Sequence, residues 1–133
     1  MYRTLTACIV VALLVLAVAA SASVTLSSPK DGATVGPSTD VVGQVSARAF
    51  CIVTTSCTAA DGTDLGMVPG LRHWTNDDNS IQVRISTPRV SFGDKGQPVN
   101  YAIHVRAYST PEKAQAAGDP DLGEATVNVK SAG

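Results

Sequence analysis

Apolar and polar residues alternate with a period of two along much of the chain after residue 23, a period typical of half-buried antiparallel strands. The clearest case is Val99–Ala107, in which the odd positions are apolar and the even positions are mostly polar. Similar alternation marks residues 24–27, 41–53, 81–86 and 124–130. Two shorter stretches, 65–68 and 90–92, are closed by Pro69-Gly70 and Gly93–Gly96. The pattern therefore predicts about seven strands.

One segment departs from this alternation. Ser109–Gly118 contains capping residues, Pro111 at the first helical position, a run of helix formers and a terminal glycine. This order predicts a short helix of about two turns in a late connection between two strands. The other turn signals recur every 8–12 residues or so, which favours an all-β antiparallel sandwich.

The beginning of the chain has a different pattern. Arg3 precedes an apolar run, Ala7–Ala20, which ends in Ala20-Ser21-Ala22. This is the three-part pattern of a secretory signal peptide with an A-x-A cleavage site. A membrane-spanning helix needs roughly 20 apolar residues, whereas this run has 14. Cys8 lies at the start of the run and not at its end, so it is badly placed for lipoprotein acylation, and we expect residues 1–22 to be removed.

The remaining residues, 23–133, have the length of one domain. Loss of Arg3 changes the formal net charge from −1 to −2. The domain has no run of Lys or Arg and no second long apolar segment. We therefore expect a secreted domain with no nucleic-acid partner and no membrane span after cleavage.

Two cysteines, Cys51 and Cys57, remain after cleavage. An even number of cysteines in an exported chain favours a disulfide, here one that closes a local turn and contributes roughly 2 kcal/mol. A metal site would need further ligands, and His73 and His104 do not have the spacing that such sites show. Free thiols are the remaining alternative.

The residues after the signal carry a family likeness. Val24–Val35 reads as an alternating strand followed by Ser-Pro-x-x-Gly-x-x-Val, and Val41-Val42-Gly43 supplies a following Val-x-Gly. This resembles the opening of bacterial and archaeal Ig-like (immunoglobulin/fibronectin-III-like) extracellular domains. The resemblance implies an Ig-like β-sandwich in which Gly123–Lys130 is the closing strand and the hydroxyl of Tyr101 bonds to nearby backbone. It covers 24–45 well and 99–130 more loosely, departs over 46–95, and specifies a fold rather than a function.

Catalytic and metal-binding patterns are sparse. The chain has no G-x-S-x-G and no H-E-x-x-H, so we expect no enzymatic activity and no cofactor. Ca²⁺ takes six to eight oxygen ligands, but Asn and Asp also favour ordinary turns, so a calcium site and a plain turn both remain open. The densest oxygen cluster is Asn76, Asp77, Asp78 and Asn79, to which Asp119 and Asp121 could add if the loops meet.

Two groups of residues are candidates for contact with a ligand or partner. Arg72, His73 and Trp74 lie in an expected loop, where a tryptophan can stack on a sugar or anchor a protein. The same tryptophan could instead fill the core of a small sandwich. The second group lies on the polar face of the strongest strand, which could also be merely solvated. This group comprises His104, Arg106 and Tyr108, joined by Asn128 and Lys130 if the last strand pairs there.

The sequence thus predicts a secreted, non-catalytic Ig-like module that binds an extracellular protein or glycan at or outside the cell surface, as an adhesin does. The alternative is a subunit of a filament or surface layer that self-associates by edge-strand pairing. A small hydrolase is the third possibility and needs a histidine within reach of a Ser or Asp in a cleft. The expected edge or donor strand is Val24, Thr25, Leu26, Ser27 and Ser28.

Overall fold

The computed structural model describes residues 23–116 and 118–132, so the expected signal peptide lies outside the described residues. The described part is all-β with one α-helix, as the alternation predicts. Within it, no helix is long and apolar enough to cross a membrane. The strands are β1 (Val24–Ser28), β2 (Thr34–Val35), β3 (Ser38–Val45), β4 (Phe50–Thr58), β5 (Asp64–Trp74), β6 (Ser80–Ser86), β7 (Asn100–Tyr108) and β8 (Glu124–Ser131).

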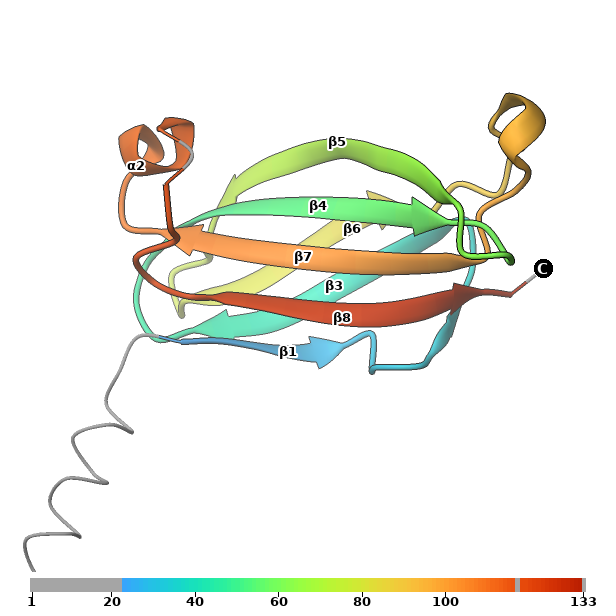
Figure 1. Cartoon of the computed structure of the whole chain (residues 1–133). Coiled ribbons are helices and arrows are strands. Elements are labelled where there is room, and N and C mark those ends of the chain that lie inside the picture. The colour runs from blue at the N-terminus through green and yellow to red at the C-terminus, as the bar shows by residue number, and fades with distance from the viewer. Residues whose placement is uncertain (1–22, 117, 133) are drawn as a thin grey trace, which may run out of the picture.

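The strands form two sheets that enclose one core (Figure 1). The smaller sheet has the order β1-β3-β6, and the larger has the order β2-β8-β7-β4-β5. The larger sheet is curled into a half-barrel. All neighbours are antiparallel except β2 and β8, which run parallel.

The core lies between the inner faces of the two sheets. Along β7, Tyr101, Ile103 and Val105 are almost fully buried, and the residues between them are partly exposed. In the smaller sheet, Val41 and Ile81 bury their side chains against the same cluster. Burial of these apolar side chains is the main force that joins the sheets, at about 1.5–3 kcal/mol for each large side chain.

Three boundaries differ from those predicted. Residues 41–53 form the end of β3 and the start of β4, with a turn between them, and not one strand. Residues 90–92 form no strand; they precede the 3₁₀ helix η1 (Gly93–Lys95). Pro69-Gly70 does not end a strand either, because β5 continues through it as a bulged edge strand. Edge strands tolerate proline and bulges because their outer N–H groups need no strand partner.

The predicted short helix is confirmed as α2 (Pro111–Gln115). The Thr110 hydroxyl caps it by accepting a hydrogen bond from the Lys113 amide, and Pro111 occupies the first turn. The helix packs on β4 and β7 at one end of the larger sheet (Figure 1).

The segment that carries the family likeness has a structural role. Gly32, with φ of 82°, donates its amide to the Asn128 carbonyl at 2.7 Å, and Asp31 Oδ1 accepts the Asn128 amide at 2.9 Å. Gly43 lies opposite Leu26 in the register, and a Cβ there would stand 2.5 Å from the Thr25 oxygen. These residues therefore fix β1 and its following loop against β3 and β8.

Tyr101 makes the backbone contact that was expected of it. Its side chain is 1% exposed, and its hydroxyl donates to the Pro88 carbonyl at 2.6 Å. Pro88 lies between β6 and β7, so this bond ties the loop to the core. Burial is the largest influence on the Tyr101 pKa and raises it.

Candidate interaction surface

The strand register brings the two groups of candidate contact residues to one face. Phe50 lies between Trp74 and Tyr108, and Ile52 lies between Arg72 and Arg106. Directly opposed residues of antiparallel strands point to the same side of the sheet. Residues from β5 and β7, more than thirty positions apart in sequence, therefore form an aromatic row and an arginine row across the outer face. His73 lies opposite the buried Cys51 and so does not share that face.

The aromatic row is built around Trp74, which is 36% exposed at the end of the edge strand β5. Its ring meets Phe50 edge-on, with 5.4 Å between the ring centroids. The Arg48 guanidinium lies 5.0 Å from the Trp74 ring centroid and 3.9 Å from Asp77. The structure thus places Trp74 on the surface and not in the core, held by an aromatic contact and a cation–π contact.

The arginine row is only partly neutralised. The Arg106 Nε lies 3.6 Å from Glu124, an ion-pair distance longer than a hydrogen bond, and its guanidinium lies 6.0 Å from the Tyr108 ring. Arg72 has no ion-pair partner among the described residues. Arg72 therefore presents an exposed cation beside the aromatic row. Met67, opposite Ser56 and further along β5, is 61% exposed, whereas Leu71 lies opposite the buried Val53 and does not share this face.

Tyr108 is not available for contact, contrary to its predicted place on a solvated face. It is 1% exposed, and its hydroxyl donates to the Gly118 carbonyl at 3.2 Å. The reason is α2, which covers this end of β7 and buries Ala114. Asn128 and Lys130 do share the outer face of β7, as predicted, because β8 pairs with β7 along its length.

His104 lies in the middle of the outer face, between two hydroxyl groups. Its Nε2 is 3.3 Å from Ser56 Oγ, and its Nδ1 is 3.0 Å from Thr126 Oγ1. A serine within reach of a histidine is what a hydrolase would require. Here, however, a hydroxyl stands where a carboxylate would orient the imidazole and stabilise its charged form.

The turn at residues 76–79 joins β5 to β6 and is held by its own side chains. Asp78 Oδ1 accepts from the Ser80 amide and hydroxyl at 3.1 and 2.6 Å, and these bonds lower the Asp78 pKa. Asn76 donates to the Ser80 hydroxyl, and Asn79 adopts a φ of 64°. Asp121 is likewise bonded to Ser109 and Lys113. The described residues, among them Asp119, contain no group of three or more His, Cys, Asp or Glu side chains that could hold a metal.

The predicted disulfide between Cys51 and Cys57 is wrong. Both cysteines are free and buried, and both lie on β4. Six residues along a strand span about 20 Å, whereas a disulfide needs Cα atoms closer than about 7 Å. Burial raises the pKa of the Cys51 thiol to about 11, and burial followed by the nearby Asp64 charge raises that of Cys57. Both thiols are therefore inert core residues.

The expected edge segment, Val24–Ser28, forms β1 at the edge of the three-stranded sheet. The sequence interpretation missed Arg48, Phe50 and Ile52 as surface residues. Phe50 and Ile52 alternate with the buried Cys51 and Val53, so their outward direction could have been read from the period of two. The position of β4 between β5 and β7 could not have been read from the sequence.

No protein-family model matches the chain, and no curated protein matches it either.

Proposed function

We propose that the protein is an exported, non-catalytic Ig-like β-sandwich domain that binds an acidic protein partner through the face formed by β5, β4 and β7. The observation that carries this proposal is the convergence of Trp74, Phe50, Arg72 and Arg106 on one exposed face. Tryptophan and arginine dominate the energetics of protein interfaces, especially where an aromatic side chain is already held in place. Arg72, which has no ion-pair partner in the part of the chain that the structure describes, favours an acidic complement.

The Ig-like part of the proposal is supported by strand order and by Tyr101. If β1, β3, β4, β6, β7 and β8 are equated with strands A, B, C, E, F and G, the neighbours are A-B-E and G-F-C. Tyr101 near the start of β7 bonds to upstream backbone, as the tyrosine corner of such sandwiches does. Export rests on the pattern of residues 1–22.

Assembly through the edges of the larger sheet has weaker support. The long edge strand β5 is interrupted by Pro69 and a bulge, and the opposite edge, β2, has two residues. Both features block the addition of another strand. Enzymatic activity has weaker support too, because the described partners of His104 are the hydroxyl groups of Ser56 and Thr126 and not a carboxylate.

The first measurement is size-exclusion chromatography with light scattering, with calcium and with chelator, across a wide range of protein concentration. A calcium-independent monomer is expected. Assembly that depends on concentration or calcium would instead favour the subunit alternative, and deletion of Val24–Ser28 would then locate the contact.

The binding face is tested with a purified partner, identified by affinity capture from the extracellular proteins of the producing organism. We expect Trp74→Ala to raise the dissociation constant by about 30-fold or more, the effect of a hot-spot residue. Arg72→Ala should raise the dissociation constant less and should reduce the dependence of binding on salt. Val90→Ala is the matched control, because Val90 is 68% exposed on the loop before η1. Equal affinity of the Trp74→Ala and Val90→Ala variants would refute the proposed face.

A further inference from the structure

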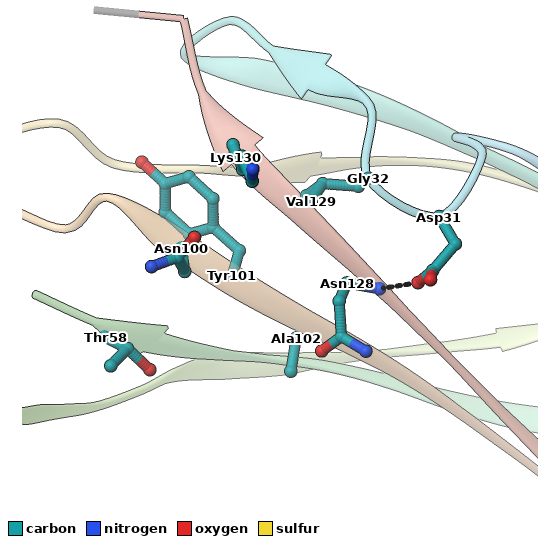
Figure 2. A pocket seen from close by; sticks show the side chains of 9 residues that line it. All are labelled: Asp31, Gly32, Thr58, Asn100, Tyr101, Ala102, Asn128, Val129 and Lys130. Carbon is teal, nitrogen blue, oxygen red and sulfur yellow. Dashed lines mark hydrogen bonds between the residues drawn. The ribbon is translucent and has the colours of Figure 1, made fainter. Parts of the chain in front are cut away.

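The outer face of the larger sheet also contains a shallow hollow at the end away from Trp74 (Figure 2). Its volume is about 280 Å³. In the register, Ala102 lies opposite Asn128, and Asn100 lies between Thr58 and Lys130. The hollow forms because Ala102 is a small residue among longer neighbours on the same face of the sheet.

The polar side chains around this hollow are unpaired. Thr58, Asn100, Asn128 and Lys130 make no side-chain hydrogen bond or ion pair within the described part of the chain. On the same face, Ser56, His104 and Thr126 bond to one another instead. Four polar side chains with unused hydrogen-bonding capacity therefore surround one depression.

The fifth polar group comes from outside the sheet. Asp31 reaches from the loop after β1, and one of its oxygens accepts the Asn128 backbone amide, as Figure 2 shows. Its other oxygen has no hydrogen-bond partner among the described residues. The hollow thus offers a carboxylate acceptor, an ammonium donor, a hydroxyl, and two amides that both donate and accept.

We propose that this hollow binds a single neutral sugar residue, as a site separate from the aromatic face. Sugar hydroxyls donate and accept at once, and adjacent hydroxyls match side-chain amides and carboxylates that offer both roles. The charges of Asp31 and Lys130 offset each other, which favours a neutral ligand over an anion or a cation. The volume lies just below the usual range of ligand pockets, about 300–1,000 Å³, and so suits one ring and not a longer chain.

The affinity should be low. Tyr101 contributes to the wall but is 1% exposed, so no aromatic ring is open for stacking. The hollow is open to solvent and buries little of a ligand. A dissociation constant of about 1 mM is expected for one sugar residue, and useful binding would require several copies on one surface.

The test is a titration of the isotopically labelled protein with galactose, mannose and N-acetylglucosamine, followed by amide chemical shifts. We expect saturable shifts at Ala102 and Asn128 with at least one of these sugars. Ala102→Leu fills the hollow and should abolish the shifts. Asn128→Ala should weaken binding at least several-fold while it keeps the backbone bond to Asp31. Ala47→Leu, in the exposed turn between β3 and β4, is the control and should bind as the parent protein does.

Two outcomes would overturn the inference. The first is the absence of saturable shifts at the hollow with all three sugars. The second is binding that Ala102→Leu and Asn128→Ala both leave unchanged. The amide spectrum of each variant reports whether it is folded, so a folding defect in Ala102→Leu would not be confused with loss of the site, and Asn128→Ala provides an independent answer.

Discussion

Replacing Tyr101 with phenylalanine tests the bond that ties the loop after β6 to the core. The change removes one hydroxyl and keeps the buried ring. The lost bond to Pro88, 2.6 Å long, contributes about 0.5–1.5 kcal/mol net. A carbonyl left unpaired adds up to about 1–3 kcal/mol where no water replaces the hydroxyl. Pro88 is half-buried, so water can reach its carbonyl in part, and we expect Tyr101→Phe to lower the free energy of unfolding by about 1–2 kcal/mol.

Urea denaturation followed by tryptophan fluorescence measures this loss, because Trp74 is the only tryptophan in the chain. The midpoint should fall while the slope stays constant, since the surface exposed on unfolding is unchanged. Thermal unfolding should shift by roughly 4–8 °C for each kcal/mol in a domain of this size. Tyr108→Phe is the control: its hydroxyl bonds to Gly118 over a longer 3.2 Å. A loss for Tyr101→Phe below about 0.5 kcal/mol, or no larger than that of Tyr108→Phe, would refute the reasoning.

Three further predictions concern other parts of the fold. Gly43→Ala should destabilise the protein by roughly 1–3 kcal/mol in the same urea assay, because the added Cβ would meet the Thr25 oxygen at 2.5 Å. Gly36→Ala is the control: its added Cβ would have no atom within 4 Å, so the midpoint should not change. Both cysteines should react with iodoacetamide in urea but hardly at all in the native protein, by intact mass; a native mass 2 Da below the reduced value would instead mean a disulfide. Hydrogen bonds from Ser109 and then Lys113 lower the pKa of Asp121 to about 2 from 3.8, so its stabilising effect is complete above pH 4 and is lost as the pH falls through 2. Protection of the α2 amides, corrected for the intrinsic exchange rate at each pH, should fall as the pH drops through that range. Asp121→Asn should lower this protection at neutral pH and remove the additional loss at low pH.

The strongest strands could be predicted from sequence because their periodicity reports burial directly. β7 and β8 alternate cleanly, since each has one face on the core and one face in solvent. The boundary of β5 could not be predicted in the same way. Pro69-Gly70 is an ordinary turn signal, and only the position of β5 at the edge of a sheet turns it into a bulge within a strand. Whether a strand lies at the edge or in the centre of a sheet depends on the topology of the sheet, which a local sequence pattern does not contain.

The sequence around the two cysteines contains a pattern that argues against a disulfide. Cys51, Val53, Thr55 and Cys57 occupy alternate positions, and all four are buried on the inner face of β4. Continuing the alternation beyond Val53 would have placed both thiols on one extended strand, too far apart to bond. The expected signal peptide and the even number of cysteines favoured a disulfide on general grounds, but strand geometry decides whether two thiols can meet.

The residues at the edges of the sheets indicate how the exposed face of β5, β4 and β7 makes contact. A flat, unprotected edge strand invites pairing with another chain, and natural sheets interrupt such edges with proline, bulges and charges. In this fold, β5 carries Pro69 and a bulge, and β6 presents Arg84, which is 72% exposed in its pair with Asp40. The same β5 nevertheless leaves Trp74 exposed beside Arg72, for which residues 23–116 and 118–132 supply no ion-pair partner. A strand whose backbone is protected against pairing but whose apolar side chains remain in solvent is suited to contact through its face, and this favours a binding module over a subunit joined by strand addition.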